Sequence, residues 1–452
     1  MFETLENIFR VEELRKKIII TLSLLIVYRL GCFIPTPGVD SVALATFFEQ
    51  LRKIQGETLL GIVNMFTGGA LQRLSIFALG VMPYISSSII MQLLTGVVPA
   101  LENLAREGKA GYEKINQYTR YLTLVICLLQ GFMLALWLEN PNNFRGILIV
   151  PDPGLIFRVV TVLTLTCGTV FIMWLGEQIQ ERGIGNGISL IIMTSIISRI
   201  PSSLYQLWVL YSPLDAAKRQ ISTVTVVSLI LIWLAVVVAV VLFTQAQRRI
   251  PIQYGKRIVG RRVYGGQSTY LPIKLDMSGV IAIIFTQSVI LFPATLATFF
   301  PGTNKFTMVI QTIFREHGLW YNLIYVSLIM FFMYFYTAIV FNPVEIANNL
   351  KKYGGFIPGI RPGKPTADYL DFVATRIVFI GAVYIAVIAT LPNMVMKVFN
   401  VPSYAITSFF GGTTVLIMVG VLLDTMRQIE GQILAQGYEG FGKSGTRLRG
   451  RK

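Results

Sequence analysis

The stretch ISTVTVVSLILIWLAVVVAVVLFTQ, at Ile221–Gln245, decides the fold class because it holds no charged residue. A helix of about 20 apolar residues is long enough to cross a bilayer. Across the whole chain 54% of residues are apolar and 14% are charged, whereas soluble domains carry about 25% charged residues. A soluble fold cannot bury this much apolar surface. The sequence therefore predicts an all-α polytopic membrane protein.

Nine further apolar stretches bring the number of expected membrane spans to ten. The first expected span is short and contains Arg29, and the fifth is interrupted by Arg199 and Pro201. In chain order the ten expected spans are Ile18–Phe33, Leu74–Thr95, Tyr121–Leu138, Val159–Gly176, Gly187–Leu210, Ile221–Gln245, Met277–Phe300, Gly318–Phe341, Ile377–Met396 and Pro402–Leu423.

Ten spans can divide into two halves of five. A half with an odd number of spans has to be inverted relative to its partner, about a pseudo-two-fold axis in the membrane plane. The division would fall near Asp215, which gives an N-terminal half at residues 1–215, a C-terminal half at residues 216–437 and a basic tail at residues 438–452. No clear sequence repeat relates the halves, so the residues permit this geometry without requiring it.

The distribution of basic residues predicts which side of the membrane each loop occupies. The formal net charge is +16, and 27 Lys and Arg residues fall on the side that holds both termini, against 10 on the opposite side. Lys and Arg accumulate in loops that stay in the cytoplasm. Both termini and the loops between spans 6 and 7 and between spans 8 and 9 are therefore expected in the cytoplasm. Acidic residues such as Glu12 near the first apolar run, and the lack of a small-residue cleavage pattern, indicate a span and not a cleaved signal.

Two of these loops, Arg248–Asp276 and Glu345–Arg376, are longer than a connection between two helices requires. They can be plain topology signals that also touch anionic lipid, or they can form a docking surface for a large acidic partner. The residues leave both interpretations open. The basic residues of the first loop are Arg248, Arg249, Lys256, Arg257, Arg261, Arg262 and Lys274, and those named in the second are Lys351, Lys352, Arg361 and Lys364.

The stretch TLLGIVNMFTGGA, at Thr58–Ala70, is apolar but too short to cross a membrane. It contains Gly68–Gly69 and runs into Gln72 and Arg73. One interpretation is a re-entrant half-helix, which is tolerated where it is buried in protein or lines a cavity. The other is an amphipathic helix that lies on the outer surface. In either case an ionisable residue at membrane depth is a functional candidate.

Motifs for catalysis, nucleotides or metals are weak. Residues Gly437–Ser444 match the phosphate-binding pattern G-x-x-x-x-G-K-[ST], but no strand precedes them and a membrane helix does. Gly183, Gly185 and Gly187 fit a tight turn into the fifth span better than a dinucleotide site. The single His317 has no second His for a metal. We expect no enzyme activity and no cofactor, and we expect Cys32, Cys127 and Cys167 to pack as small apolar groups.

Six long strings resemble the SecY family, the central channel subunits of the bacterial Sec protein translocase, and together they run through essentially the whole chain in order. They are MFTGGALQRLSIFALGVMPYISSSIIMQLL at Met65–Leu94, KINQYTRY at Lys114–Tyr121, MWLGEQIQERGIGNGISLII at Met173–Ile192, GRRVYGGQSTYLPIKLDMSGVI at Gly260–Ile281, ILFPAT at Ile290–Thr295 and FNPVEIANNLKKYGGFIPGIRPG at Phe341–Gly363.

The resemblance implies two inverted five-helix halves around an hourglass pore, with a short re-entrant helix that plugs the outer funnel. Residues 58–73, which we call the plug segment, fit that helix. Val81 is smaller than the Ile usual in the family, and Ala282 stands where the family often has Pro. The implied plug residues are Asn64, Met65, Phe66, Thr67, Gly68, Gly69, Ala70, Leu71, Gln72 and Arg73. The implied pore ring of aliphatic side chains is Val81, Ile85, Ile188, Ile192, Ile284 and Ile417.

The resemblance also implies a lateral gate between the second and third spans on one side and the seventh and eighth on the other. Signal peptides and transmembrane segments would leave by that gate into lipid. Ordinary packing or interhelical hydrogen bonding explains the same residues equally well. The implied gate residues are Ser86, Ser87, Ser88, Gln130, Gln287 and Phe292.

The partners implied by the resemblance are SecE, SecG, the SecA ATPase, the ribosome, signal peptides, nascent chains and membrane lipids, but no DNA. The implied location is the bacterial cytoplasmic membrane. A secondary transporter is the alternative function, because transporters also use inverted repeats and broken helices; a membrane scaffold is a third class. The residues implied in motor or ribosome docking are Arg248, Arg249, Lys256, Arg257, Arg261, Arg262 and Arg361.

Overall fold

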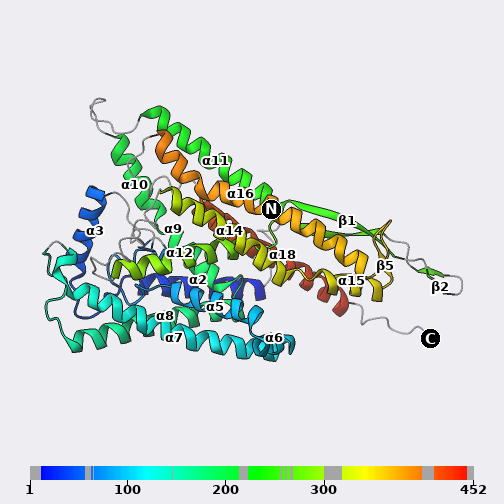
Figure 1. Cartoon of the computed structure of the whole chain (residues 1–452), viewed down its shortest axis with the longest axis horizontal. Coiled ribbons are helices and arrows are strands. Elements are labelled where there is room, and N and C mark those ends of the chain that lie inside the picture. The colour runs from blue at the N-terminus through cyan, green and yellow to red at the C-terminus, as the bar shows by residue number, and fades with distance from the viewer. Residues whose placement is uncertain are drawn as a thin grey trace.

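The structure, a computed structural model, describes residues 12–55, 63–64, 66–144, 146–212, 222–254, 257–259, 262–264, 268–299, 318–399 and 412–444. Most of the long helices run along the long axis of the molecule, and a β-hairpin extends beyond them at one end (Figure 1). We call this end the hairpin end.

The first part of the chain folds into a group of helices that runs from α2 to α10. The elements of this group are α2 (Glu12–Gly31), α3 (Ser41–Gln55), α5 (Met82–Val97), α6 (Pro99–Arg106), α7 (Lys109–Glu139), the 3-10 helix Pro141–Phe144, α8 (Leu155–Arg182), α9 (Gly187–Ile197) and α10 (Ile200–Tyr211).

The second part of the chain folds into the helices α11 to α18, with the hairpin strands inserted after α11. The helices of this group are α11 (Thr223–Gln245), α12 (Val280–Phe299), α14 (Leu319–Val340), α15 (Pro343–Lys352), α16 (Lys364–Phe399) and α18 (Thr413–Ser444). The expected division near residue 215 lies outside the described residues.

Each of the ten expected spans overlaps a helix. By length and apolar content, the described residues hold six helices able to cross a membrane, or seven if α5 and α6 count together as one span. These two helices are bent by 96° where they meet, at Val98. Helix α6 is amphipathic and has no buried residue, which suits a helix lying along an interface. The chain is thus a multi-pass helical membrane protein.

The expected start of the second span at Leu74 is wrong, since α5 begins at Met82. Residues 67–80 form turns, because Leu74 has φ +41° and Gly80 has φ +60°, values that no α-helix contains. Residues 74–76 instead pair with the segment after α2: the Thr36 N–H donates to the Leu74 carbonyl oxygen at 2.8 Å. The helix starts where Pro83 occupies its first turn, a position that tolerates proline.

The fifth expected span is interrupted as its Arg199 and Pro201 predict, and it divides into α9 and α10. The turn before it also matches the prediction, since Gly185 has φ +92°. Asn186 then caps α9, with its Oδ1 accepting from the Ser189 N–H at 3.1 Å. The sequence NGIS therefore fixes where α9 begins.

The two long basic loops contain regular structure that the sequence analysis did not predict. Strand β1 (Gln247–Tyr254) pairs antiparallel with β4 (Ser268–Lys274), and β5 (Gly355–Phe356) adds to the other edge of β1. Strands β2 (Arg257–Val259) and β3 (Arg262–Tyr264) pair beyond them. Ile250 and Ile273 pack with Leu370 and Val373 of α16 in a separate apolar cluster. The second loop is partly helical, since it contains α15 and the first turns of α16.

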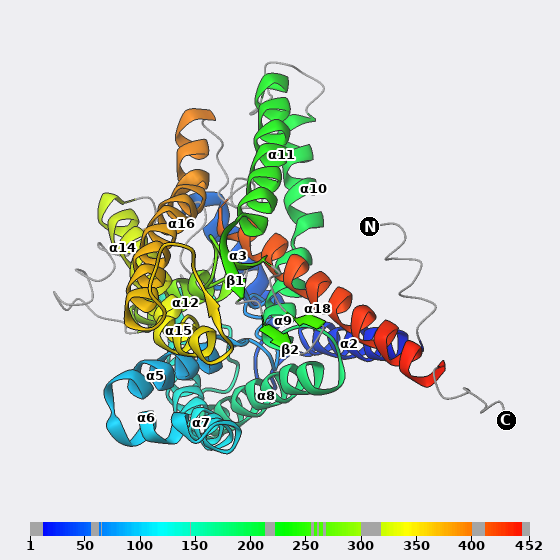
Figure 2. The ribbon, with the colours of Figure 1, turned by 90° about the vertical axis from the view of Figure 1, so that its right-hand side faces the viewer.

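The described parts of the two groups of helices meet at α10, which packs against α11 and α16, and along two seams formed by α12 and α18. Helix α12 contacts α5 and α7, and α18 contacts α9 and α2. Seen from the hairpin end, α5 to α8 lie on one side and α11, α14 and α16 on the other, with α12, α9 and α18 between them (Figure 2). The largest buried cluster draws residues from both groups. A site formed on these seams is therefore built from both parts of the chain.

Three smaller expectations can be compared with the structure. Cys32 and Cys127 are buried, as expected for small apolar groups, but Cys167 is exposed on the surface of the bundle. Residues Gly437–Ser444, the pattern that matches a phosphate-binding loop, belong to the end of α18 and so have helical backbone. Among the described residues, no three His, Cys, Asp or Glu side chains gather as they would around a metal ion.

Candidate functional site

The plug segment is described at residues 63–64 and 66–73, and Met65 lies outside the described residues. The described helical part ends at Phe66, and turns follow. Gly68 and Gly69 have φ +65° and +89°, a backbone conformation that side chains with a Cβ rarely adopt. The two glycines therefore end the helix and reverse the chain.

Asn64 organises the plug segment. Its carbonyl oxygen accepts from the Gly69 N–H at 2.9 Å, and its Oδ1 accepts from the Gln72 N–H at 3.0 Å. Its Nδ2 also donates to Gln72 Oε1 at 3.4 Å. Asn64 is 3% exposed, so these bonds satisfy polar atoms that water does not reach. The described part of the plug segment is a compact, internally bonded loop.

The plug segment packs against α2 and α9. Arg29 of α2 donates from Nη1 to the Gly68 carbonyl oxygen at 3.1 Å. Beneath it, the hydroxyls of Tyr28 and Ser195 form a buried hydrogen bond of 2.6 Å between α2 and α9. Thr67 is fully buried, and a Cβ added to Gly80 would lie 2.9 Å from its Cγ2. The segment thus fills a space that the first helix, α9 and the turn before α5 enclose.

The six residues expected to form the pore ring come from α5 and its N-cap, α9, α12 and α18. Five of them are buried in the largest apolar cluster, and Ile188 packs against it. Ile85, Ile188 and Ile284 also line one cavity of about 130 Å³. Three of the six expected ring positions, on three different helices, therefore lie on the wall of one cavity.

The cavity next to these aliphatic side chains is also lined by polar residues, beside the apolar Ile281 and Phe285. Gln92, Gln180 and Asn186 contribute amides, and Ser88 and Ser189 contribute hydroxyls. A cavity of about 130 Å³ has room for several waters, because about 10–15 Å³ is enough for one. Gln180 lies near the end of α8 and Asn186 lies directly before α9, whereas Gln92 lies inside α5. Water can thus reach the aliphatic side chains from this side.

A second, smaller cavity of about 40 Å³ lies where α5, α7 and α12 meet. Three expected gate residues line it, namely Ser86 of α5, Gln130 of α7 and Phe292 of α12. Leu71 of the plug segment lines it as well. Along α5, Met82 and Ser86 face this cavity while Ile85, Ser88 and Gln92 face the polar one. The plug segment and the seam between the helix groups therefore line the same small cavity.

The remaining expected gate residues lie elsewhere. Ser88 lines the polar cavity and accepts from Gln92 Nε2 at 3.2 Å. Ser87 is fully buried and its hydroxyl donates to the Pro83 carbonyl oxygen at 2.8 Å, within its own helix. Gln287 accepts from the Tyr325 hydroxyl of α14 at 3.1 Å. Ser87 and Gln287 thus bond within their own group of helices.

Sequence reasoning missed other residues of the α5–α12 seam. Ser288, Leu291 and Thr295 of α12 line the same small cavity as Phe292. The Ser288 hydroxyl lies 3.8 Å from the Met82 sulfur, which joins the two helix groups directly. The signal was available, because positions spaced three, four and seven apart on a helix share one face.

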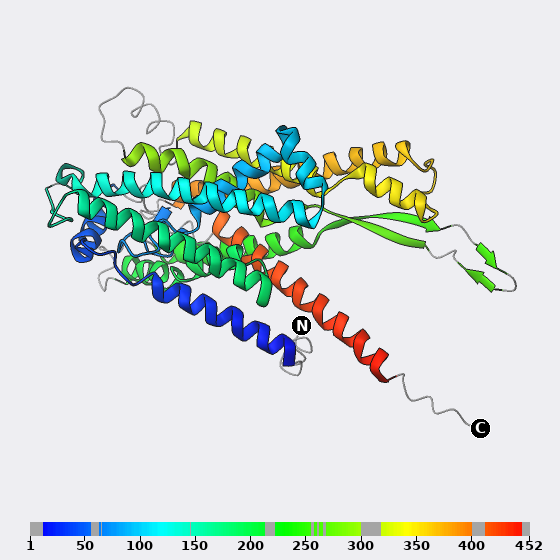
Figure 3. The same cartoon turned by 90° about the horizontal axis from the view of Figure 1, so that it is seen from below.

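Most of the expected docking residues that the structure describes lie on the strands of the hairpin. Arg248 and Arg249 are exposed on β1, and Arg361 is exposed after β5. Arg257 and Arg262 lie on β2 and β3, and Arg262 is the register partner of Val259. Seen from below, this hairpin reaches well beyond the ends of the helices (Figure 3). Lys256 and Arg261 lie outside the described residues.

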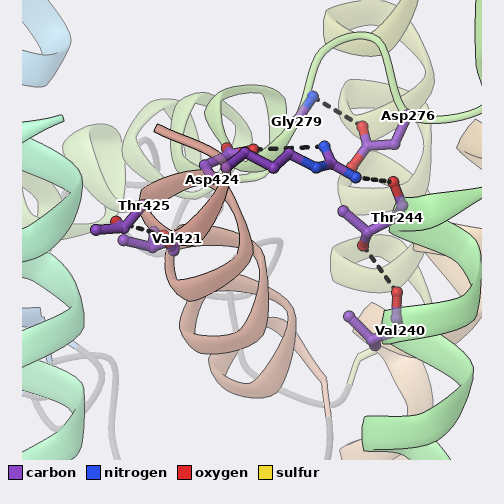
Figure 4. A network of polar contacts seen from close by, with 8 residues as sticks. Val240, Thr244, Asp276, Gly279, Val421, Asp424 and Thr425 are labelled. Carbon is purple, nitrogen blue, oxygen red and sulfur yellow. Dashed lines mark hydrogen bonds and ion pairs between the residues drawn. The ribbon is translucent and has the colours of Figure 1, made fainter. Parts of the chain in front are cut away.

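A polar cluster that the sequence analysis did not identify joins α11, α12 and α18 (Figure 4). Arg427 of α18 donates to the Thr244 carbonyl oxygen of α11 at 3.0 Å and pairs with Asp424 at 3.8 Å. Asp276, two residues after β4, accepts from the Gly279 N–H at 2.8 Å just before α12 begins. Burial raises the pKa of the Asp276 carboxyl to about 6, and Asp424 adds to this rise. The connection between the hairpin and α12 therefore holds a carboxyl group whose pKa is raised.

The chain is similar to known translocase subunits and channels. The SecY family profile matches residues 75–426. The protein translocase subunit SecY of Aquifex aeolicus is 45% identical over 442 residues, which cover 98% of this chain and 99% of that protein.

Two solved structures share the fold. One is a SecY channel in which the plug domain stabilises the closed state and maintains a membrane seal, with a TM-score of 0.62 and 16% identity over 96% of this chain and 95% of that one. The other is Sec61 in the canine ribosome-channel complex from the endoplasmic reticulum, with a TM-score of 0.61 and 15% identity over 96% and 95% of the two chains. On the extent of the family match and the identity to a translocase subunit, the chain belongs to the SecY family.

Proposed function

We propose that this chain is a passive channel that moves unfolded secretory polypeptides across the cytoplasmic membrane of a bacterium. The observation that carries the proposal is that Ile85, Ile188 and Ile284, from three different helices, line one cavity, while the other three expected ring residues are buried in the same apolar cluster. Ile85 of α5 lines the polar cavity. Met82 and Ser86 of the same helix line the small cavity, together with Leu71 of the plug segment. We infer that the six residues form the ring through which a chain passes.

The chemistry of these side chains suits a passage for many sequences. Val and Ile side chains offer no hydrogen bond to a sliding peptide, so no one sequence is held strongly. An apolar constriction excludes ions because water leaves it when no chain is present. The pairs Val81/Ile85 and Ile188/Ile192 are spaced four residues apart, so each pair lies on one helical face. The ring can therefore seal around a moving chain and close again behind it.

We infer that the seam between α12 and the pair α5–α7 is the lateral gate, and that the plug segment blocks the pore beside it. An apolar residue such as Leu gains about 0.3–0.6 kcal/mol at the centre of a membrane helix, whereas a charged residue costs about 2.5–3.5 kcal/mol. An apolar segment that reaches an open seam will leave into lipid, and a polar segment will continue through. Ser86, Gln130 and Phe292 line the closed seam and are the side chains that a departing segment would meet first.

We place both termini and the hairpin in the cytoplasm, on the distribution of basic residues. The two five-helix halves of the proposed channel are residues 1–215 and 216–437. A passive channel needs a motor, and SecA and the ribosome are the proposed sources of movement, with SecE and SecG as membrane partners. The canine relative in the ribosome-channel complex supports a ribosome partner. The exposed Arg248, Arg249 and Arg361 offer cations to the phosphates of ribosomal RNA.

The channel proposal is tested by cross-linking. A secretory chain stalled during translocation is presented to variants that carry a photoreactive residue at Ile85 or at Ile192. We expect both to cross-link to the chain. The matched control carries the probe at Leu231 of α11, which is 61% exposed on the outside of the bundle, and we expect no cross-link there. A stalled chain that cross-links to none of the six ring positions would overturn the proposal.

The docking proposal has its own test. Reversing Arg261 and Arg262 to Glu replaces two positive charges by two negative ones, at the first residue of β3 and at the position before it in the sequence, and we expect these charges to repel ribosomal RNA. Ribosome co-sedimentation at low salt should fall, and wild-type binding should weaken as salt increases. Unchanged co-sedimentation of the variant would contradict ribosome docking through these two arginines and would leave the channel proposal intact.

A further inference from the structure

Arg29 lies in the last turn of α2, within the first span expected from the sequence. Its guanidinium is half-buried and donates to the Gly68 carbonyl oxygen at 3.1 Å. We propose that Arg29 is the positioning residue that holds the plug segment in the closed channel. The inference rests on the proposed function, because a plug segment matters only if the chain is a channel.

The Gly68 carbonyl oxygen can accept a hydrogen bond from Arg29 because of the backbone conformation at Gly68. Gly68 has φ +65°, in the turn that follows the helical residues of the plug segment. A Cβ added there would lie 2.7 Å from Arg29 Nη1 and 3.2 Å from Ser195 Cα. Gly68 thus lets the chain approach both α2 and α9 closely. Any larger residue would push the carbonyl away from the guanidinium.

The bond to Arg29 differs in kind from the other contacts of the plug segment. Asn64, Thr67 and Gln72 bond within the segment and keep its shape. Arg29 donates to it from another helix, across 39 positions of the chain. A hydrogen bond from a charged donor is about twice as strong as a neutral one. Removing this donor should therefore loosen the segment from α2 while leaving its internal bonds in place.

A second cation limits how strongly the plug segment is held. Arg73, which belongs to the segment, lies over the Phe33 ring at 4.3 Å from the centroid. Arg29 lies near the same ring, at 5.5 Å. The ring attracts both guanidinium groups, but the two like charges repel each other. Among the described residues, the plug segment is therefore held by the bond from Arg29 and by a weaker contact of Cys32 Sγ with the Thr67 carbonyl oxygen at 4.0 Å, while the charge of Arg73 beside Arg29 opposes closure.

The test measures ion leak and export in proteoliposomes that contain the full chain with its membrane partners. Arg29→Met removes the donor and keeps a long side chain. A hydrogen bond to a charged group contributes about 1.5–3 kcal/mol, so we expect the leak of the closed channel to rise about 10- to 100-fold. Arg29→Lys keeps the charge on a compact ammonium group but loses the planar fork of the guanidinium, and we expect an intermediate leak. Arg29→Met should also export a precursor whose signal peptide is defective.

The matched control is Arg73→Met, which removes a cation from the same ring and leaves the Gly68 carbonyl bonded. We expect the leak to change by less than about threefold, since loss of attraction to the ring and relief of repulsion oppose each other. A rise in leak as large as that of Arg29→Met would overturn the inference. So would Arg29→Met channels that are as ion-tight as wild type, even if their melting temperature is lower.

Two outcomes separate this inference from the proposed function. If wild-type channels export a normal precursor but Arg29→Met does not leak, the inference fails and the channel remains. If wild-type channels export nothing with a motor present, the proposed function itself fails. If Arg29→Met does not insert into membranes, Arg29→Lys is used as the test variant. An ion leak of Arg29→Lys equal to that of the wild-type channel would then overturn the inference.

Discussion

A Cβ atom added to Gly168 of α8 would overlap the carbonyl oxygen of Ile76. Ile76 follows the plug segment, and its own N–H donates to the Ile34 carbonyl oxygen at 3.0 Å. Helix α8 thus packs directly against the backbone that connects the plug segment to α5. This close approach is possible only because position 168 has no side chain.

We predict that Gly168→Ala lowers the melting temperature of the purified channel. The added methyl group forces α8 away from the backbone of Ile76, and such overpacking costs about 1–3 kcal/mol. The control is Gly96→Ala in α5, where a Cβ would meet no atom within 4 Å. That change should leave the melting temperature equal or slightly higher, because Ala favours helix over Gly. Equal melting temperatures for the two variants would contradict the packing argument.

A second prediction concerns the hydrogen bond between Tyr325 and Gln287. Both residues are buried, at 4% exposure each, so Tyr325→Phe leaves the Gln287 amide without this donor. We expect a loss of about 1–3 kcal/mol in stability, measured as a lower melting temperature. The control is Tyr334→Phe on the same helix, whose hydroxyl donates to the Thr375 carbonyl oxygen at 3.4 Å in an exposed contact. Its effect should be much smaller, and a similar loss in both variants would refute this account.

The helices were predictable because their signal is strong and local. A run such as Thr223–Gln245 can satisfy its backbone in a membrane only as a helix. The hydrophobic pattern did not predict where α5 begins, because the backbone conformation before it sets that boundary. Residues 74–80 are as apolar as the helix that follows, yet the positive φ values at Leu74 and Gly80 exclude them from it. Hydropathy does not report φ, so the start of α5 was misplaced.

The candidate site was predictable only in part. Residues that belong to local sequence motifs could be identified, whereas contacts between segments far apart in the chain could not. The positions of Ile85 and Ile188 came from family motifs, and the structure places both on one cavity. The bond from Arg29 to Gly68 and the bond from Arg427 to the Thr244 carbonyl oxygen depend on segments far apart in the chain. The hairpin was missed because β1 reads QRRIPIQY, in which a proline and two arginines weaken the strand pattern.

A third prediction concerns pH. The Asp276 carboxyl has its pKa raised from 3.8 to about 6 in the folded chain, first by burial and then by the nearby Asp424, while Lys274 and the Gly279 N–H oppose the rise. The unfolded chain therefore loses this proton at lower pH than the folded chain does. Stability should decrease as the pH rises from about 4 to about 6 and then level off, by on the order of 1–3 kcal/mol.

Asp276→Asn tests this, because the amide oxygen can still accept from the Gly279 N–H but carries no charge. We expect the variant to be more stable than wild type at pH 7 and to lose the decline between pH 4 and 6. The measurement is the melting temperature at a series of pH values. Asp152→Asn, at an exposed position, should keep the wild-type profile. A decline that persists in Asp276→Asn would show that another group causes it.

The last prediction separates the shape of the plug segment from its attachment. Asn64→Ala removes the Oδ1 that accepts from the Gln72 backbone N–H at 3.0 Å. Gln72→Ala removes only the Oε1 that lies 3.4 Å from Asn64 Nδ2 and keeps the backbone bond. We therefore expect Asn64→Ala to raise the ion leak clearly and Gln72→Ala to raise it little.

The two causes of leak can be distinguished by combining variants. If Asn64 acts by holding the turn that presents the Gly68 carbonyl to Arg29, its loss removes the same bond that Arg29→Met removes. The leak of Arg29→Met/Asn64→Ala should then be close to that of the larger single variant, as expected for residues that share one interaction. Multiplied effects would instead mean that Asn64 and Arg29 hold the plug segment independently. In that case the turn at Gly68 would not depend on the Asn64 side chain.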